Sequence, residues 1–388
     1  MRLSRLAARN LFRNRVRTAL TVLGGAVAVL TFLVLRTAVG SWTAAVDFAA
    51  KDRIVTRHKI TFVMLLPKRY AEEVRAVPGV KATTYASFVG ARDPRHERDF
   101  FFNIGVESDT FFDVMDEMVV PPAELASWKR ERTGAIVGDA LAKKMGWKVG
   151  DRVVLRGSMY PGDWEFRISG IYTATRKSVD RSTFALHWSY LNEKAPPAMK
   201  DQIGWVIARV QQPGQVAATC AAIDKHFDSR DTQTTSQSER EFNTSFLGML
   251  SAVLKAIDIV SVAILVIMMM ILGNTIAMGV RERTSEHGIL RAIGFSPGHI
   301  GAMILVETAL TGLAAGALGL GLAYPFVNHG MGVWIEENMG AFFPFFRINP
   351  RDAAVALLAP AVLGLLAALP STVSAVRARV VDTLRHVA

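Results

Sequence analysis

Four long apolar segments constrain the fold of this chain more than any other feature of its sequence. Within its 388 residues they occupy positions 18–35, 259–278, 300–327 and 353–370. A helix needs about 17 to 25 mostly apolar residues to cross the hydrocarbon core of a bilayer, and each segment is long enough. The first segment has the position of a signal peptide, but its apolar core is long and no A-x-A-like cleavage site follows it, so we interpret it as a retained span.

The arginines predict the orientation of these spans, because short loops rich in Lys and Arg stay on the cytoplasmic side of a bacterial plasma (inner) membrane. Arginines also flank the loop between the second and third spans, and they follow the fourth span. Six precede the first span: Arg2, Arg5, Arg9, Arg13, Arg15 and Arg17. Both termini are therefore predicted to be cytoplasmic. The net charge of +11 reflects this bias and does not indicate nucleic-acid binding.

The predicted segments follow from these spans and from the polar stretches between them. In order they are a basic N-terminal segment (1–17), the first span with the start of a stalk (18–39), an extracytoplasmic α/β domain (40–245), a stalk with the second span (246–278), a cytoplasmic coupling helix (279–299), the third span (300–327), an extracytoplasmic loop (328–352), the fourth span (353–372) and a cytoplasmic tail (373–388). The fold class is thus a membrane protein with four transmembrane helices and an α/β domain inserted between the first two.

The inserted domain alternates strand-like and helix-like patterns, which predict two lobes. KITFVMLLP predicts a buried strand, and PKRYAEEVRAVPGV then predicts a helix with Pro67 in its first turn. WVIARV predicts another strand, followed by a helix with an apolar face that includes Cys220. These two units form one lobe, and FFFNIGV, DRVVLRG, FRISGIYT and STFALHWSYL predict a second lobe richer in strands.

Enzymatic chemistry is not predicted for this chain. Gly294 to Gly298 match G-x-S-x-G, but a nucleophile elbow needs a strand before Ser296, and the preceding residues have a helical pattern. No G-x-x-x-x-G-K-[ST] phosphate loop occurs, and the histidines lack metal-ligand spacing. Cys220 is the only cysteine, and its place in an apolar helical face favours a core residue over a reactive thiol. We therefore expect no catalytic residue, no metal and no cofactor in this chain.

The charged stretch RERTSEHGILRAIGFSPGHI lies between the second and third spans. Its charges and apolar residues have helical spacing, which predicts a short amphipathic helix at the membrane interface. Such a helix is either a connector that positions two spans or a docking element for a cytoplasmic partner. The residues alone leave both interpretations open.

Within this stretch, the residues EHGILRAIGFS resemble the loop between the second and third spans of FtsX-like permeases of the MacB type, which belong to ABC transporters. LAARNLFRNRVRT before the first span, AIVGDALAKKMGWKVGDRVVL in the inserted domain and SAVRARVVDTLRHV at the end of the chain are also similar to that family. Macrolide exporters of this type carry a fused ATPase domain, and no such segment precedes the first span here. The resemblance therefore implies a separate ATPase chain.

The resemblance implies the permease subunit of an ABC transporter, which works as a homodimer or with a related permease, above two cytoplasmic ATPase subunits that bind ATP and Mg. ATP-driven motion would pass through the coupling helix to the extracytoplasmic domain, a process called mechanotransmission, and would drive export or extraction of a lipophilic, peptide or drug-like substrate. A periplasmic adaptor protein is a further candidate partner. The alternative is a regulatory FtsX-like complex that controls an extracytoplasmic partner such as a cell-wall hydrolase. The residues that would contact the ATPase, by this resemblance, are Glu286, Gly288, Ile289, Leu290, Arg291 and Gly294.

Three further residues of the third span are candidates for a functional role. Glu307 lies about 10 Å along the helix axis from the start of the span, and a carboxylate in the membrane should face protein or water. It is either a switch element or part of a dimer seam, or it pairs with a hydroxyl or an arginine such as Arg13 or Arg17. Gly312 and Gly316 form G-x-x-x-G, which permits close helix contact within one chain or between two.

Overall fold

The computed structural model describes residues 14–377 except 48, 97–98, 177–178, 250, 340–342 and 344. The chain divides into two compact units. We call the first the bundle, which comprises the described parts of 1–40, 251–332 and 346–388. We call the second the α/β domain, which comprises 41–250 and 333–345. Each unit is described by itself.

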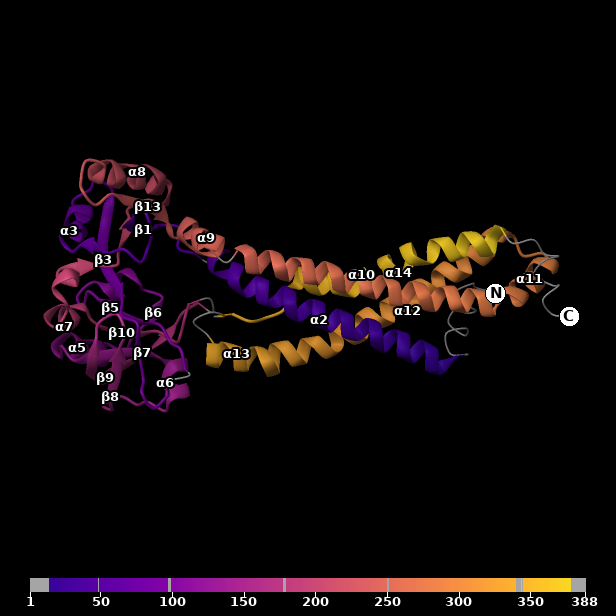
Figure 1. Cartoon of the computed structure of the whole chain (residues 1–388), viewed down its shortest axis with the longest axis horizontal. Coiled ribbons are helices and arrows are strands. Elements are labelled where there is room, and N and C mark those ends of the chain that lie inside the picture. The colour runs from indigo at the N-terminus through magenta and orange to yellow at the C-terminus, as the bar shows by residue number, and fades with distance from the viewer. Residues whose placement is uncertain are drawn as a thin grey trace. The chain divides into compact units, whose positions relative to one another are not determined.

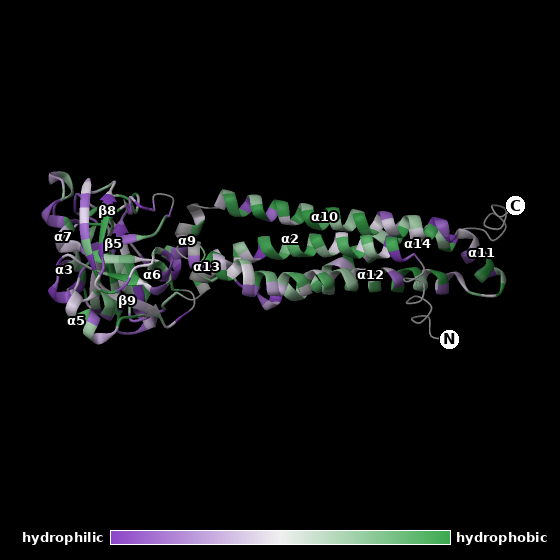
Figure 2. Cartoon of the chain, turned by 90° about the horizontal axis from the view of Figure 1, so that it is seen from below, coloured by the Kyte–Doolittle hydropathy of each residue, from purple (hydrophilic) through white to green (hydrophobic). Residues whose placement is uncertain are grey.

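Four helices in the described residues are long and apolar enough to cross a membrane. Figure 2 shows that hydrophobic residues run along their length. Because α2 and α10 flank residues 48–250, the α/β domain is inserted between the first two spans, as predicted. The helices that contain the spans are α2 (Arg15–Asp47), α10 (Ser251–Glu282), α12 (Pro297–Pro325) and α14 (Pro350–Arg377).

The third span is longer than predicted. The sequence predicted a loop from residue 328 to residue 352, but α12 continues into the π-helical turn η3 (Phe326–Met331) and then α13 (Gly332–Met339). Pro325 lacks the N–H that would continue the regular ladder, and wide turns of this kind commonly follow such an interruption. The turn leaves Asn328 able to bind the returning chain: its carbonyl accepts a hydrogen bond from Arg347 Nη1, and its Oδ1 accepts one from the Ile348 amide at 3.1 Å.

The α/β domain is built on one mixed sheet of eleven strands, ten of which follow the order β13-β1-β12-β3-β5-β10-β7-β9-β8-β4, while β6 pairs with β9. Strands β2 (Leu66–Pro67) and β11 (Gln202–Ile203) form a separate pair. The two predicted lobes therefore share a continuous sheet (Figure 1). The strands of the large sheet are β1 (Arg53–His58), β3 (Val80–Phe88), β4 (Ala91–Arg92), β5 (Asn103–Val106), β6 (Met118–Val119), β7 (Gly134–Gly138), β8 (Arg152–Gly157), β9 (Gly162–Ala174), β10 (Phe184–His187), β12 (Trp205–Val210) and β13 (Thr234–Ser238).

One end of the sheet is covered by α3 (Arg69–Arg75) and α8 (Val216–Phe227), as the two predicted strand–helix units require. On β12, Val206 and Ala208 pack under these helices, while Ile207 points to the opposite face, because successive strand side chains alternate. Cys220 is buried in the same cluster, where burial raises the pKa of its thiol to about 12. The thiol is therefore a core group, as predicted.

The first strand of this lobe was predicted wrongly. KITFVMLLP was expected to be a buried strand, but the strand is the preceding segment β1, and Ile60, Val63 and Met64 are exposed. The strand β1 pairs with both β12 and β13, so its backbone hydrogen bonds are satisfied on both sides although its side chains are partly polar. The following helix also begins after Pro67, at Arg69.

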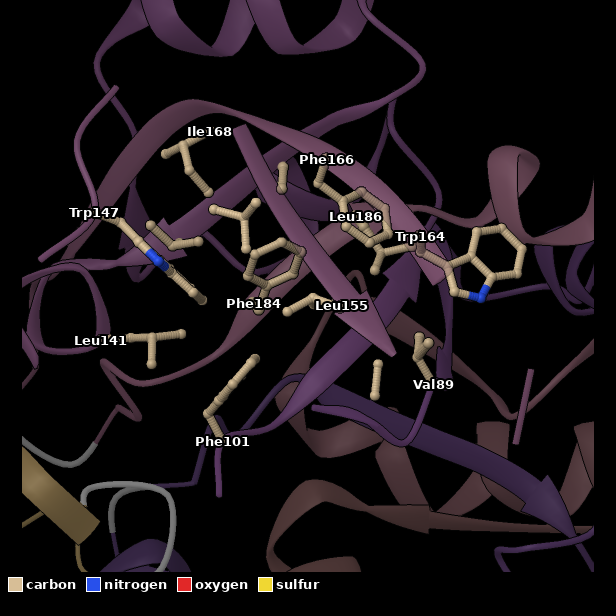
Figure 3. Packing of buried hydrophobic residues seen from close by; sticks show 14 of the residues in the cluster. Val89, Phe101, Leu141, Trp147, Leu155, Trp164, Phe166, Ile168, Phe184 and Leu186 are labelled. Atoms are coloured by element: carbon tan, nitrogen blue, oxygen red, sulfur yellow. The ribbon is translucent and has the colours of Figure 1, made fainter. Parts of the chain in front are cut away.

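The other end of the sheet surrounds an aromatic core (Figure 3). The ring of Phe184 on β10 lies 5.3 Å from that of Phe166 on β9 and 5.8 Å from that of Trp147. Both contacts are edge-to-face, the arrangement that aromatic quadrupoles favour. The helices of the central and far parts of the sheet are α4 (Phe111–Val114), α5 (Pro122–Arg130), α6 (Asp139–Met145) and α7 (Trp188–Glu193).

Candidate functional site

The candidate functional site is the turn between the second and third spans. It contains one short helix, α11 (Thr284–Ala292), as the charge pattern predicted. The helix ends in a Schellman motif, since the Phe295 amide bonds to the Leu290 carbonyl at 3.0 Å and the Gly294 amide bonds to that of Arg291 at 3.1 Å. Gly294 adopts a φ of +106°, which favours glycine. This residue therefore ends the helix and lets the chain turn into α12.

The two sides of α11 differ in exposure. Ile289 is 52% exposed and Ile293 is 68% exposed, whereas His287 and Gly288 are buried. Among the other residues predicted to contact a partner, Glu286, Leu290 and Arg291 are half-buried. Arg291 Nη1 lies 3.5 Å from the carbonyl of Val376 on α14. The helix thus turns one apolar edge outward while its other side is held by the bundle.

A polar cavity lies behind α11 and encloses about 50 Å³. Four elements contribute to it, namely α2, α10, α11 and α12. Its lining contains two arginines, one glutamate, one histidine and several threonine hydroxyls, an unusual set for the interior of a transmembrane bundle. The polar lining residues are Arg17, Thr18, Thr21, Thr275, Arg283, His287, Glu307, Thr308 and Thr311.

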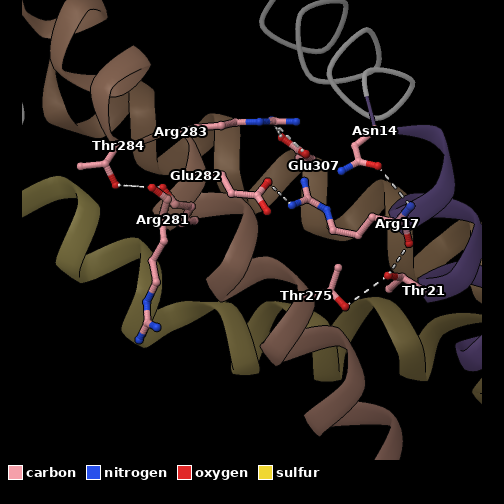
Figure 4. A network of polar contacts seen from close by, with 10 residues as sticks. Asn14, Arg17, Thr21, Thr275, Arg281, Glu282, Arg283, Thr284 and Glu307 are labelled. Atoms are coloured by element: carbon pink, nitrogen blue, oxygen red, sulfur yellow. Dashed lines mark hydrogen bonds and ion pairs between the residues drawn. The ribbon is translucent and has the colours of Figure 1, made fainter. Parts of the chain in front are cut away.

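Two ion pairs lie beside this cavity (Figure 4). The residues that contribute to them from the junction of α10 and α11 are neighbours of opposite charge, Glu282 and Arg283. Arg283 Nη1 contacts both carboxylate oxygens of Glu307, at 2.9 and 3.1 Å. Its neighbour Glu282 forms an ion pair with Arg17 of α2. A hydrogen bond of 3.2 Å between the hydroxyls of Thr21 and Thr275 also joins α2 to α10. The junction between α10 and α11 is therefore tied to both α2 and α12.

Glu307 pairs with an arginine, as one interpretation of the sequence predicted. The arginine is Arg283, however, and not Arg17, which was one of the two residues named as examples. The reason is that α10 extends to Glu282, so Arg283 lies directly after its end, and the turn through α11 brings the first turns of α12 back against Arg283. Arg13 lies outside the described residues. Sequence reasoning also missed Glu282 and Arg283 as site residues. They are neighbours of opposite charge, which could have suggested that each pairs with a different partner.

His287 was not predicted as a site residue. Its side chain is buried, one turn after Arg283, and its Nδ1 has no hydrogen-bond partner among the described residues. Burial lowers the pKa of this imidazole, and the nearby Arg283 lowers the pKa further. Both effects favour the neutral form of the ring, which is one of the groups that line the cavity.

The glycines of the third span bring α12 against α14 of the same chain. A Cβ on Gly312 would lie 2.6 Å from the Ala361 Cα, and one on Gly316 would lie 2.4 Å from the Leu357 carbonyl oxygen. Both distances are shorter than any real contact, so only glycine permits this helix separation. The G-x-x-x-G face is thus occupied by packing within one chain.

The G-x-S-x-G match has no strand before it. Ser296 follows α11 and precedes Pro297, the first residue of α12, and its Oγ lies 2.6 Å from Nδ1 of His299. Ser296 has the N-cap position of α12, and its exposed hydroxyl bonds to the side chain of His299 and makes no capping hydrogen bond to the helix backbone. A nucleophile elbow requires a strand–turn–helix arrangement, which the described residues around Ser296 do not have.

Two family models match the chain. Residues 18–226 match the MacB-like periplasmic core domain, and residues 259–379 match the FtsX-like permease C-terminal region. The first match alone covers more than half of the sequence. The chain therefore belongs to the ABC transporter permeases of the FtsX/MacB type and is a multi-pass membrane protein.

Similar curated proteins carry the same description. An uncharacterized ABC transporter permease of Mycobacterium tuberculosis, Rv0987, is 23% identical over 280 residues, which cover 68% of this chain and 30% of that protein. The ABC transporter permease YtrF of Bacillus subtilis is 37% identical over 79 residues, which cover 20% of this chain and 15% of that protein. The chain spans less than a third of the length of these relatives.

Two solved structures are similar to part of this chain. The extracellular domain of the ABC-type transporter YknZ from Gram-positive bacteria aligns with a TM-score of 0.37 and 14% identity, over 48% of this chain and 98% of that one. The periplasmic region of MacB from Actinobacillus actinomycetemcomitans aligns with a TM-score of 0.38 and 10% identity, over 50% of this chain and 92% of that one.

Proposed function

We propose that this permease is driven by a separate cytoplasmic ATPase that docks on α11 and hydrolyses ATP with Mg. The observation that carries this proposal is the exposed apolar edge of α11, formed by Ile289 and Ile293, in a turn whose other side is held in the bundle. Helix recognition by a partner uses apolar anchors of this spacing.

The proposed machine works by mechanotransmission. Movement of α11 is passed through α2 and α10, whose chain continues into the α/β domain, and the change in that domain drives export or extraction of a lipophilic, peptide or drug-like substrate. Both termini and α11 lie on the cytoplasmic side of the inner membrane, and the α/β domain lies outside it. A second copy of this chain or a related permease completes the unit, and a periplasmic adaptor is a further candidate partner.

The docking surface is tested by charged substitutions on the exposed edge of α11. We expect Ile289→Asp to reduce recovery of the ATPase about tenfold or more when the tagged full-length chain is purified from native membranes, because truncation of a central apolar anchor costs about 2 kcal/mol or more. Glu286→Lys should act in the same direction. Recovery is measured by quantitative mass spectrometry of the co-purified proteins.

The matched control is Val149→Asp, at an exposed apolar position of the α/β domain. It introduces the same charge on an aliphatic side chain that is 48% exposed, and it should leave ATPase recovery unchanged. Equal recovery with Ile289→Asp and the wild type would show that the ATPase does not dock at this edge. A cell-wall hydrolase among the co-purified proteins would favour the regulatory alternative over export.

A further inference from the structure

We infer that Glu282 and Arg283 are positioning residues for energy coupling: their two opposite ion pairs make α11 move together with α2 and α12. This inference rests on the proposed docking of an ATPase at α11. It concerns the step after docking, in which force on one short helix must reach the spans that the force does not touch directly.

The covalent connections of α11 do not by themselves transmit its movement to α2 and α12. The helix is joined directly to α10, but toward α12 the chain passes through the turn at Gly294, whose left-handed backbone ends the helix. No covalent segment joins α11 to α2. A load on α11 would therefore move α10 while leaving α2 and α12 behind, unless side chains tie them to the junction.

The two ion pairs supply these ties from adjacent residues. Glu282 is the last residue of α10 and pairs with Arg17 near the start of α2, and Arg283 directly precedes α11 and pairs with Glu307 of α12. Because the two charges at the junction are opposite, each selects a different helix. Exchanging them would place like charges against each other at both contacts.

The two ties differ in strength. The side chains of Arg283 and Glu307 are 11% and 25% exposed, whereas those of Arg17 and Glu282 are 19% and 58% exposed. Breaking a buried pair leaves an uncompensated charge in a poorly hydrated place, and a half-exposed partner can turn to water instead. The tie to α12 is therefore the stronger of the two.

The polar cavity lets the helices around it shift while the two ion pairs persist. It holds about 50 Å³ of free space among polar groups, and the buried side chain of His287, on α11, is one of its lining residues. Such a polar space accommodates small shifts of its walls because water can solvate the groups that separate. The helices around it can thus change position while the charged contacts persist.

The test exchanges the two charges at the junction. The double variant Glu282→Arg with Arg283→Glu keeps composition and net charge but opposes like charges at both ties. Spin labels at Leu20 on α2 and Leu313 on α12, in the full-length complex with its ATPase and with Cys220→Ser, report the distance change on addition of ATP. In the wild type this distance changes. In the double variant we expect the ATP-dependent change to fall about fivefold or more, with ATPase recovery unchanged.

Rescue separates coupling from general damage. Adding Arg17→Glu and Glu307→Arg restores both ties with reversed polarity and should restore the distance change. If the double variant fails to fold, Glu307→Gln and Glu282→Gln replace it, and the first should lose more of the change than the second. A double variant with a full ATP-dependent change, a fourfold variant without rescue, or equal effects of the two Gln variants would overturn the inference. Loss of ATPase recovery from the wild type itself would instead contradict the proposed docking.

Discussion

The α/β domain and the bundle bury very different side chains. The largest fully buried side chains of the domain include Trp128, Trp164 and Phe184, whereas the buried positions of α12 are mostly glycine, alanine and threonine. In water the burial of large apolar groups drives folding, but lipid tails are as apolar as leucine, so helices in a membrane associate through close packing and polar contacts. The domain is therefore held by apolar area, and the bundle is held by backbone proximity and a few ion pairs.

This contrast explains why the candidate coupling elements lie in the bundle. A densely packed core transmits strain but resists rearrangement, because each side chain has a fixed place. In the bundle, by contrast, the contacts around the cavity depend on Arg17, Glu282, Arg283 and Glu307. In the mechanism that we propose, the bundle is therefore the part whose helix positions the ATPase changes, and the α/β domain is the part that is moved.

The largest effect is expected in the aromatic core of the domain. Phe184→Ala should lower the free energy of unfolding by about 3 to 5 kcal/mol, since it removes a buried ring and leaves a cavity. All seven tryptophans lie in the α/β domain, so denaturant unfolding of the full chain followed by tryptophan fluorescence reports on this unit. Phe100→Ala, at a ring that is 43% exposed, is the control and should cost about 1 kcal/mol or less. Equal losses would contradict the core assignment.

A smaller effect is expected where the bundle packs through glycine. Gly312→Val would push α12 away from Ala361 and should cost about 1 to 3 kcal/mol, the usual penalty of overpacking. Thermal aggregation of the detergent-solubilised chain measures this loss, while the tryptophan unfolding curve should not change. Gly321→Val, on the same helix with nothing within 4 Å of its added Cβ, is the control. A shift of the tryptophan curve by Gly312→Val would show that the two units do not unfold separately.

The smallest effect is expected for an ion pair in water. Arg156 Nε lies 3.3 Å from Asp163 Oδ1 on the neighbouring strand, and the two side chains are 65% and 60% exposed. Asp163→Asn should change the free energy of unfolding by less than about 0.5 kcal/mol, because solvent screens such pairs. The same tryptophan experiment measures it. A loss above about 1 kcal/mol would remove the distinction between this pair and the buried pair at Glu307.

The sequence predicted the spans because their hydropathy is averaged over many residues. Each apolar run reaches the minimum length of about 17 residues for a span, so errors of a few residues at the ends do not change the assignment. The helix with Cys220 was also predicted, since its apolar residues follow the 3.6 period, and the strand WVIARV was predicted as a short, nearly continuous apolar run. The charge pattern of residues 281–300 likewise predicted α11.

The sequence failed where tertiary contacts override a local pattern. The partly polar strand β1 is stabilised by pairing on both sides, whereas Ile60, Val63 and Met64 after it are exposed. The helix continues past Pro325 because Asn328 binds the returning segment at Arg347 and Ile348. At the site, the partner of Glu307 and the burial of His287 depend on how α10, α11 and α12 meet, and no spacing along the chain encodes that.

The central claim is that an ATPase contacts α11. The most direct measurement replaces Ile289 with a photo-crosslinking amino acid, irradiates native membranes and identifies the adducts of the full-length chain by mass spectrometry. A covalent adduct with a P-loop ATPase, lost when Ile293→Asp is added on the same edge, is the result that we predict. Adducts with lipid alone, with no protein joined to this position, would show that α11 is only a connector at the membrane interface and would contradict the account.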